Sequence, residues 1–373
     1  MRRLIICKIL LTTMFVGIGF AQADPFQKGL DEFNAQRYDD AIVWFQKAVD
    51  AAPSNYSAIY NIGLCHYRLD RFDKAVQFFR DALKINPAYT NAWIQLGNAL
   101  DYLDRYSEAI AAYQKAIEIE PNNGSAYFEL GVAHYRKKLY SEAIKAFEQC
   151  VRLRPEYNTG HYRLGLAYLG AKDSNKAMRS IERAVELGIT NGWAQFELAK
   201  LYIKNGRTDD ALSLLLSATR LKPDLADAHK LRGDVYLDKS MYTEGINAYK
   251  EAIRIDPEYV DAYLGIGNAY YNQDLYEESL PHYKRVVELS PNYVVGNVYL
   301  ADAYLNLKRY PEASSHYRTA ILNDPKRADA YYGLGLCFVY TANKSEASAQ
   351  LEKLRTLDAG LAAKLEAKIQ SMK

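Results

Sequence analysis

The sequence has little of several features that mark common classes of protein. It contains four cysteines in 373 residues, one of them near the N-terminus, and the three that remain do not make a disulfide framework. No charge predominates, because 47 basic side chains are balanced by 45 acidic ones. That balance argues against a sequence-independent binder of nucleic acid, which needs a strong basic excess. After the N-terminal stretch, no apolar run approaches the roughly 20 residues that cross a membrane.

The first 23 residues are organised like a signal peptide. Arg2 and Arg3 give a positively charged start, an apolar run is densest over 9–20, and the small residues Ala21 and Ala23 follow it. The unbroken run has twelve residues, which is short for a retained membrane anchor and favours cleavage after Ala23. Without the three basic residues of this leader, 44 basic and 45 acidic side chains remain. We therefore expect an exported protein, periplasmic or secreted, with no stable membrane anchor.

Eight of the 11 prolines recur at a fixed interval. They stand at positions 53, 87, 121, 155, 223, 257, 291 and 325. Every interval is 34 residues except one of 68, where Ile189 takes the expected place. A frame that starts at Gln22 gives ten repeats with no insertion or deletion, and such a period predicts a solenoid instead of separate globular domains. The repeats begin at residues 22, 56, 90, 124, 158, 192, 226, 260, 294 and 328.

Several positions of this frame, here called columns, hold one kind of residue. Column 8 is almost always glycine, column 20 is small, and column 24 is usually a large aromatic residue. Spacings of 3, 4 and 7 between such columns are helical and divide each repeat into two helices, roughly columns 2–14 and 18–31. A proline after the second helix prevents that helix from continuing. The small columns indicate that the two helices approach each other closely.

These residues resemble the tetratricopeptide repeat family, whose pattern is Trp-x2-Leu-Gly-x2-Tyr, then Ala-x3-Phe, Ala and Pro. Repeat three fits the pattern with Trp93, Leu96, Gly97, Ala109, Tyr113, Ala116 and Pro121. The resemblance implies an all-α fold, a right-handed superhelical solenoid of ten helix-turn-helix repeats over residues 24–360. Residues 361–373, with Leu361, Leu365 and Ile369 on one face, are predicted to form a C-terminal capping helix.

Departures from the pattern gather in repeats five to eight. Repeat five ends without a proline, Arg232 replaces the leucine of repeat seven, and Pro281 falls inside the second helix of repeat eight. A proline in a helix interior kinks or strains the helix. We expect altered curvature or lower local stability in these middle repeats.

Patterns that carry catalysis or bind metal are missing from the sequence. It has neither a His-Glu-x-x-His arrangement nor a Cys-x-x-Cys pair. His66 and His134 occupy column 11, where packing is the expected role. Cys65, Cys150 and Cys337 belong to different repeats and read as small buried residues. We expect no enzyme activity, no catalytic residue, no cofactor and no metal site.

In the resembling family the first helices line a concave groove, with columns 2, 5, 9, 12 and 13 directed inward. The first six repeats then supply an aromatic wall with arginines beside it: Phe26, Tyr60, Tyr67, Phe128, Tyr135, Tyr162 and Phe196, with Arg68, Arg136 and Arg163. Repeats seven to nine supply a polar segment instead: Asp234, Asp238, Asn268 and Asp302. Two alternatives remain open. Aromatic residues at helical spacing are often core, and the acidic segment could be a solvated face.

A groove of this kind predicts a protein or peptide ligand. A micromolar complex needs about −8 kcal/mol, whereas one buried apolar side chain contributes roughly 1.5–3 kcal/mol, so several anchors in a row are required. Our hypothesis is a non-enzymatic scaffold or adaptor of the cell envelope that binds a partner polypeptide. The alternative is a periplasmic binder of a small apolar ligand or lipid that serves a transporter or an envelope-assembly complex. Self-association through the terminal repeats is a third possibility, and no nucleic acid is expected.

Overall fold

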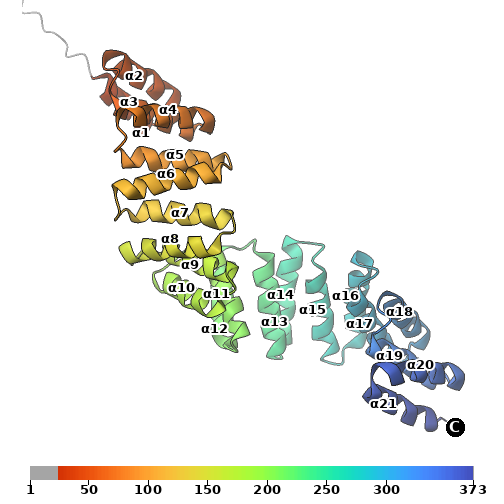
Figure 1. The fold of residues 1–373 in the computed structure, drawn as a ribbon. Helices are drawn as coiled ribbons and strands as arrows, with labels where there is room; N and C mark the ends of the chain where they lie inside the picture. The colour runs from red at the N-terminus through yellow and green to blue at the C-terminus, as the bar shows by residue number, and fades with distance from the viewer. Residues whose placement is uncertain (1–23, 373) are drawn as a thin grey trace, which may run out of the picture. The chain divides into compact units, whose positions relative to one another are not determined.

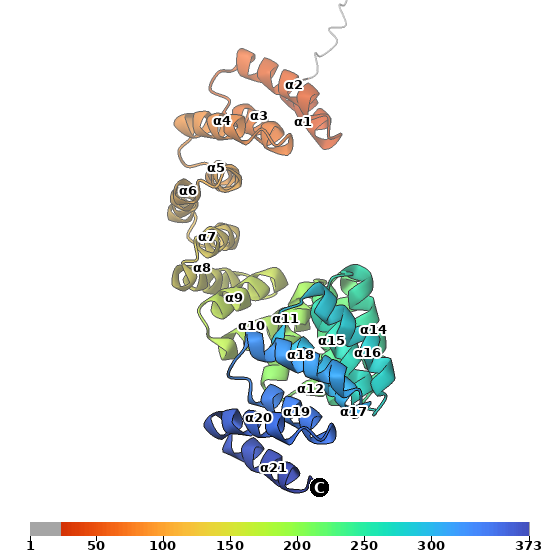
Figure 2. The ribbon, with the colours of Figure 1, turned by 90° about the vertical axis from the view of Figure 1, so that its right-hand side faces the viewer.

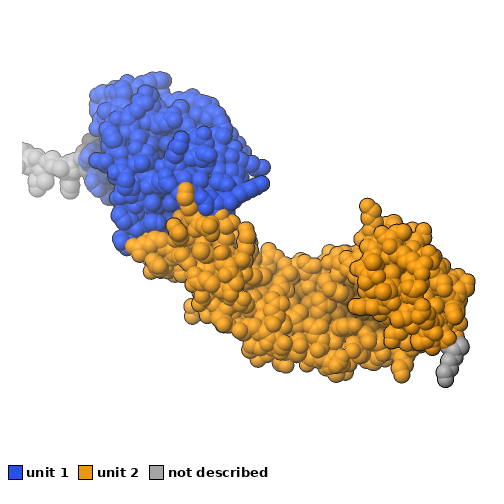
Figure 3. Space-filling view, turned by 60° about the horizontal axis from the view of Figure 1, so that its bottom comes forward, with its two compact units in different colours: residues 1–173 blue, residues 174–373 orange. Residues whose placement is uncertain are grey.

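The structure is a computed structural model that describes residues 24–372. The predicted leader, residues 1–23, lies outside the described part of the chain. Within residues 24–372 the regular elements are 21 α-helices (Figure 1). They fall into two compact units, one up to Asp173 and one from Ser174 (Figure 3). The division falls inside repeat five, the repeat that lacks its proline.

Unit 1 consists of four helical hairpins followed by one helix. Its elements are α1 (Pro25–Asn34), α2 (Tyr38–Ala51), α3 (Tyr56–Arg68), α4 (Phe72–Ile85), α5 (Thr90–Tyr102), α6 (Tyr106–Ile119), α7 (Gly124–Arg136), α8 (Tyr140–Leu153) and α9 (Asn158–Gly170). Each helix packs against the next in the chain, and first helices also contact the first helices of neighbouring hairpins. Figure 2 looks nearly along α5, α6 and α7 and shows this stacking.

Unit 2 consists of one helix, five hairpins and a last helix. Its elements are α10 (Ser174–Glu186), α11 (Gly192–Lys204), α12 (Thr208–Leu221), α13 (Ala226–Asp238), α14 (Tyr242–Ile255), α15 (Val260–Tyr271), α16 (Tyr276–Leu289), α17 (Val294–Asn306), α18 (Tyr310–Asn323), α19 (Ala328–Tyr340), α20 (Lys344–Leu357) and α21 (Ala359–Gln370). The predicted all-α solenoid of ten 34-residue helical hairpins is confirmed. From here on, odd-numbered helices from α1 to α19 are called first helices and the faces they form are called first-helix faces.

Each hairpin turns at column 15, where the backbone is left-handed. Lys138 has a φ of 59° and Ala342 a φ of 58°, and in all ten repeats this residue has a positive φ. Only repeat six uses glycine there, Gly206. Left-handed backbone is unfavourable for residues with a Cβ. In the other nine repeats the helices that the turn connects must therefore hold this conformation.

In six of the ten hairpins the core is a column 24 ring that lies on the column 8 glycine. In repeat two, Phe79 is fully buried, and a Cβ on Gly63 would lie 2.7 Å from its ring. In repeat eight, Tyr283 is 1% exposed, and a Cβ on Gly267 would lie 2.4 Å from that ring. Column 8 is therefore glycine because the column 24 ring occupies the space of a side chain, as the small columns predicted.

Column 4 joins consecutive repeats through a hydrogen bond to the loop before it. The partner is the carbonyl of the residue six positions earlier, usually the periodic proline. The pairs are Trp93 with Pro87, His161 with Pro155, Gln195 with Ile189, His229 with Pro223, Tyr263 with Pro257, and Asn297 with Pro291. Two of the six histidines are thereby accounted for as structural residues, since their ring nitrogens lie 2.9 and 3.0 Å from these carbonyls.

The structure also tests two sequence predictions, the C-terminal capping helix and the effect of the proline inside the second helix of repeat eight. Leu365 and Ile369 of α21 are buried, and Leu365 packs against Gly335 of the last hairpin, as a capping helix should. Pro281 does not end α16, which continues through it from Tyr276 to Leu289. Among residues 24–372, none of the helices combines the length and apolar character that a membrane span needs.

Candidate functional site

The column 5 aromatic residues pack under the first-helix faces more than they line them. Tyr60, Tyr162 and Phe196 are 9%, 7% and 6% exposed. The prediction that aromatic rings are exposed on this face is therefore wrong at these three positions. Phe26 and Phe128 are half-buried. The binding role of these residues stays a prediction.

At Tyr60 and Phe128 a second ring, which the sequence interpretation did not consider, covers the column 5 ring. Tyr60 packs against Phe79 of its own hairpin at 5.6 Å and is covered by Tyr89 at 4.9 Å between ring centroids. Phe128 lies between Phe147 at 5.8 Å and Tyr157 at 5.3 Å in the same way. Tyr89 and Tyr157 occupy column 34, the last column of the same repeat, and close over the column 5 ring from the loop that follows the hairpin. Phe26 likewise packs on Phe45.

Column 12 is more open, and it brings in a residue that sequence reasoning missed. Tyr67 is half-buried and meets Phe72 and Tyr102 edge-to-face. Tyr102 stacks on Phe72 at 4.7 Å and is 59% exposed, one of the most exposed large aromatic side chains described. Its signal was available, because column 13 is one of the inward columns and Tyr102 stands there. Tyr135 is also half-buried and packs edge-to-face on Tyr140.

The arginines predicted beside the wall have different roles. Arg136 of α7 forms an ion pair with Asp101 of α5, with 2.7 Å between Nη1 and Oδ2. Asp101 is 8% exposed, and burial raises the pKa of its carboxyl group. Burial, and then the nearby charge of Asp101, raises the pKa of Glu129 to about 7. Arg68 and Arg163 are exposed, and the charge of Arg163 partly offsets the rise at Glu129.

The polar segment of unit 2 has a structural origin. In each of repeats seven, eight and nine, the column 24 ring is a tyrosine whose hydroxyl donates to the column 9 residue of the same hairpin. The bonds run from Tyr249 to Asp234 at 2.9 Å, from Tyr283 to Asn268 at 2.8 Å and from Tyr317 to Asp302 at 2.5 Å. These column 9 residues thus accept hydrogen bonds from buried hydroxyl groups. Neither interpretation of the polar segment, as a binding surface or as a solvated face, had predicted this role.

Asp234 is the member of the polar segment whose two carboxylate oxygens both accept hydrogen bonds from other residues of the chain. Its second oxygen accepts from the Lys230 ammonium at 2.9 Å, in addition to the bond from Tyr249. Burial raises the pKa of Asp234, and the lysine opposes that shift. With both oxygens bound, Asp234 has little capacity left for a ligand.

The other three members line one pocket of about 430 Å³ in unit 2, together with Asn272 and three tyrosines. We call it the polar pocket; its lining comes from α13, α15, α16, α17 and the residue after α15, and consists of Leu237, Asp238, Asn268, Tyr271, Asn272, Tyr283, Tyr299 and Asp302. Asp238 and Asn272 are exposed, and their side chains form no hydrogen bond or ion pair with other residues of the described chain. Burial raises the pKa of Asp302 to about 6, although its bond from Tyr317 opposes the rise.

The chemistry of the polar pocket is that of an acceptor for cations and hydrogen-bond donors. It offers two carboxyl groups, two amides and tyrosine rings, and no basic side chain belongs to its lining. Within residues 24–372 no three histidine, cysteine or acidic side chains are grouped closely enough to hold a metal ion. Cys65, Cys150 and Cys337 are buried and form no disulfide, and burial raises the pKa of the Cys150 and Cys337 thiols to about 11.

Family models of tetratricopeptide repeats match most of the chain. They cover residues 94–158, 139–191, 168–235, 233–274, 260–293 and 300–360. A further model, described as anaphase-promoting complex (cyclosome) subunit 3, matches residues 34–116. A comparison with curated protein sequences gives no match.

Solved structures similar to the chain share its helical repeats. The C-terminal part of a TPR repeat-containing protein from Cytophaga hutchinsonii is 19% identical with a TM-score of 0.54, over 64% of this chain and 98% of that one. YrrB, described as a TPR protein with an unusual peptide-binding site, is 28% identical with a TM-score of 0.45, over 49% and 95%. Yeast Tom70 is 13% identical with a TM-score of 0.42, over 92% and 94%. The first of these likenesses supports the fold, while the function has to be argued from the site.

Proposed function

Because the chain belongs to the tetratricopeptide repeat family, we propose that it is a non-enzymatic scaffold of the cell envelope that binds a partner polypeptide. The partner lies on the first-helix face of unit 2, and the polar pocket receives one of its basic or donor side chains. The same protein is exported, because its first 23 residues have the organisation of a signal peptide.

The observation that carries the proposal is the polar pocket itself. Asp238 and Asn272 are exposed at its mouth without partners in the described chain, and Asp302 lies deeper and is only partly satisfied by Tyr317. A lysine or arginine side chain can bind these oxygens with charge-assisted hydrogen bonds, which are about twice as strong as neutral ones. Its charge would also remove the cost of ionising Asp302 in a buried place.

One pocket is not enough for a stable complex, and the same unit supplies further contacts. A micromolar affinity needs about −8 kcal/mol net, whereas one charged hydrogen bond contributes about 1.5–3 kcal/mol. Trp193 on α11 and Tyr340 on α19 are 41% and 51% exposed on first helices. Exposed aromatic rings of this kind are typical anchors for a polypeptide.

A small apolar ligand or lipid fits this pocket less well. Its lining consists of carboxyl, amide and phenol groups with one leucine, and an apolar ligand would strip water from these groups without replacing their hydrogen bonds. The burial of Tyr60, Tyr162 and Phe196 also leaves less aromatic surface than the apolar alternative requires. Polypeptide binding is therefore preferred.

The test compares two double variants of the full chain in a pull-down from the envelope fraction. Asp238→Ala with Asn272→Ala removes the two free groups at the pocket mouth. Glu244→Ala with Asn247→Ala is the matched control, because it removes one acidic and one amide side chain at exposed positions on a second helix, α14. Proteins retained by each are quantified by mass spectrometry, and the affinity of the most enriched protein is then measured with purified components.

We expect the pocket variant to bind that protein at least about tenfold more weakly, which corresponds to the loss of one charged hydrogen bond, and the control to match the unmodified chain. Equal affinity of all three proteins would refute a polypeptide site at the polar pocket. Native mass spectrometry that shows a retained lipid, lost only from the pocket variant, would favour the apolar alternative. Cell fractionation with N-terminal sequencing tests export, for which the expected first residue is Asp24.

A further inference from the structure

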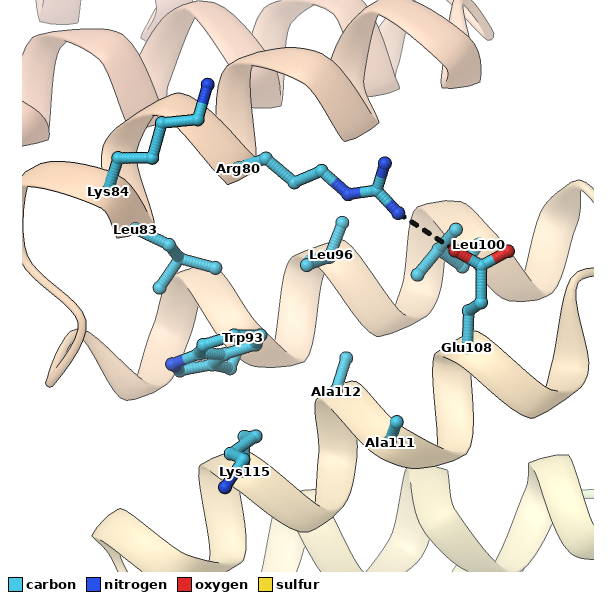
Figure 4. A pocket seen from close by; sticks show the side chains of 10 residues that line it. All are labelled: Arg80, Leu83, Lys84, Trp93, Leu96, Leu100, Glu108, Ala111, Ala112 and Lys115. Atoms are coloured by element: carbon cyan, nitrogen blue, oxygen red, sulfur yellow. Dashed lines mark hydrogen bonds and ion pairs between the residues drawn. The ribbon is translucent and has the colours of Figure 1, made fainter.

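A second pocket, of about 560 Å³, opens in unit 1 between α4, α5 and α6 (Figure 4). Most of its lining is apolar: Leu83, Trp93, Leu96, Leu100, Ala111 and Ala112. We call it the apolar pocket. Two of its three helices are second helices of their hairpins, so it does not belong to the first-helix face that carries the proposed function.

The apolar pocket exists because repeat three lacks a pair of rings that other repeats have. Columns 11 and 23 face each other across a hairpin, and in three repeats both are stacked rings. The pairs are His66 with Phe78 at 5.2 Å, Tyr270 with His282 at 5.7 Å and Tyr304 with His316 at 5.9 Å. In repeat three these columns hold Leu100 and Ala112, and it is the only one of the ten repeats with a ring at neither column. The space that rings fill in those three repeats is therefore not filled by a ring in repeat three.

The rim of the apolar pocket has acidic and basic side chains at one end and only basic side chains at the other. At one end Arg80 of α4 reaches across to Glu108 of α6, with 2.8 Å between Nη2 and Oε2 (Figure 4). Glu108 also accepts from Arg105, so the only carboxylate of the lining is held by two arginines. At the other end stand Lys84 and Lys115.

The two lysines have only weak partners within the chain. Lys84 is 76% exposed and pairs with Asp81 three residues earlier; Lys115 is 55% exposed and pairs with Glu118 three residues later. Exposed pairs within one helix contribute little to stability, so a carboxylate that is brought to this end by a ligand can compete for both ammonium groups.

We propose that the apolar pocket binds an aromatic side chain of a partner polypeptide whose neighbouring residues are acidic. The ring fills the space of the missing pair and packs against Trp93, while the flanking carboxylates bind Lys84 and Lys115. This site is independent of the polar pocket, and either proposal can fail without the other.

The experiment uses the full chain with 5-fluorotryptophan at its three tryptophans. Trp93 lines the apolar pocket, whereas Trp44 and Trp193 do not and serve as internal references; Trp93→Phe identifies the signal of position 93. The probe is the capped peptide acetyl-Asp-Glu-Phe-Glu-Asp-amide, titrated by fluorine NMR. The same peptide with alanine in place of phenylalanine tests the ring, and acetyl-Asn-Gln-Phe-Gln-Asn-amide tests the charges.

We expect a saturable shift of the position 93 signal alone, with a dissociation constant near or below about 1 mM for a single anchor. The alanine peptide should bind at least about tenfold more weakly, because it lacks the buried ring. No shift of that signal at about 10 mM phenylalanine peptide, or equal binding of the alanine peptide, overturns the proposal.

Variants of the chain separate the ring from the charges. Ala111→Phe places a ring over the pocket from an exposed position and should abolish binding; Ser213→Phe, at the same column of repeat six and also exposed, should not. Lys84→Gln with Lys115→Gln should weaken the acidic peptide at least about fivefold and leave the neutral peptide unchanged. Unchanged affinity in Ala111→Phe, or in the lysine variant, contradicts the site. Tighter binding of octyl glucoside than of the peptide would make the occupant an apolar small molecule and also overturn it.

Discussion

Units 1 and 2 fill the same space between the helices of a hairpin in two ways. In unit 1 most column 24 rings are phenylalanines that face an aliphatic residue in column 9. These pairs are Phe45 with Leu30, Phe79 with Leu64 and Phe147 with Val132. In unit 2 the rings of repeats seven to nine are tyrosines bonded to Asp234, Asn268 and Asp302. Repeat three, where Tyr113 donates to Asn98 at 2.8 Å, shows that the pairing follows the residue and not the unit.

This difference shows that the first-helix face inherits its polarity from the core. A buried phenol must have a hydrogen-bond partner, and the reachable position is column 9, which opens on the first-helix face. A tyrosine inside the hairpin therefore requires an amide or carboxyl group on the first-helix face, and two of these acceptors, Asn268 and Asp302, line the polar pocket. A phenylalanine permits an aliphatic residue there instead.

The test with the largest expected effect removes the hydroxyl group that donates a hydrogen bond to the Asp302 carboxylate. Tyr317→Phe should lower the free energy of unfolding by about 2–3 kcal/mol, because Asp302 stays buried and loses its hydrogen bond. Tyr113→Phe in unit 1 should cost only about 1 kcal/mol, since its partner Asn98 is a neutral amide. Native-state hydrogen exchange of α17 and α5 measures the two effects, which suits a repeat protein that need not unfold in one step.

The double variant Tyr317→Phe with Asp302→Leu is the matched control. It converts repeat nine to the phenylalanine–aliphatic pairing of unit 1 and should recover most of the lost stability. If the double variant were less stable than Tyr317→Phe alone, the two kinds of pairing would not be equivalent solutions of the same packing problem.

The period of the sequence was sufficient to predict the helices, the hairpins and the capping helix, because a 34-residue repeat with small and aromatic columns leaves one way to pack. It was not sufficient to place the column 5 rings. Helical spacing puts Tyr60 on an inner face, but it cannot show that Tyr89, from the following loop, closes over that ring. That contact depends on how far successive hairpins are rotated, which no single repeat encodes.

The tyrosine–acceptor pairing, by contrast, was present in the sequence. Tyr249, Tyr283 and Tyr317 each stand 15 residues after a polar residue of column 9, and the phenylalanines stand 15 after an aliphatic one. Considering columns one at a time hides this correlation. The same comparison of two columns reveals the missing ring pair of repeat three.

The second test uses pH. The pKa of Asp302 is raised from 3.8 to about 6 in the folded protein, so the folded state binds this proton more tightly than the unfolded chain. Its contribution to stability is complete below about pH 4 and is lost as the pH rises to about 6, by on the order of 2 kcal/mol. Asp302→Asn should remove this decline.

Denaturant unfolding from pH 3.5 to pH 7.5, followed by hydrogen exchange in α17, checks the prediction. Glu129 provides the comparison in unit 1, because its pKa is raised from 4.5 to about 7 and the corresponding decline should occur at higher pH in α7. A pH profile of α17 that is unchanged by Asp302→Asn would show that another group titrates there.

The third test concerns the proline that only unit 2 has inside a second helix. Pro281→Ala should restore a backbone N–H in α16 and raise the free energy of unfolding by about 1–2 kcal/mol, less than the usual cost of an interior proline because the unfolded chain also gains freedom. Pro311→Ala is the control, since Pro311 lies in the first turn of α18 and should change stability little. Hydrogen exchange of α16 measures the gain, and an equal effect of both substitutions would contradict a strained α16.

The smallest test asks where the two units should not differ. Lys138 and Lys308 occupy column 15 of unit 1 and unit 2, and both have a φ of 59°. Glycine reaches this region without the steric cost that a Cβ brings. The greater freedom of glycine in the unfolded chain offsets part of this gain. Lys138→Gly and Lys308→Gly should therefore each raise the free energy of unfolding by a net amount of about 0.5–1 kcal/mol. Thermal unfolding beside hydrogen exchange of the flanking helices measures the gains. Equal gains mean that the hairpin turn is the same in both units, which leaves the paired columns 9 and 24 as the source of their difference; a gain in one unit alone would place part of that difference in the turns.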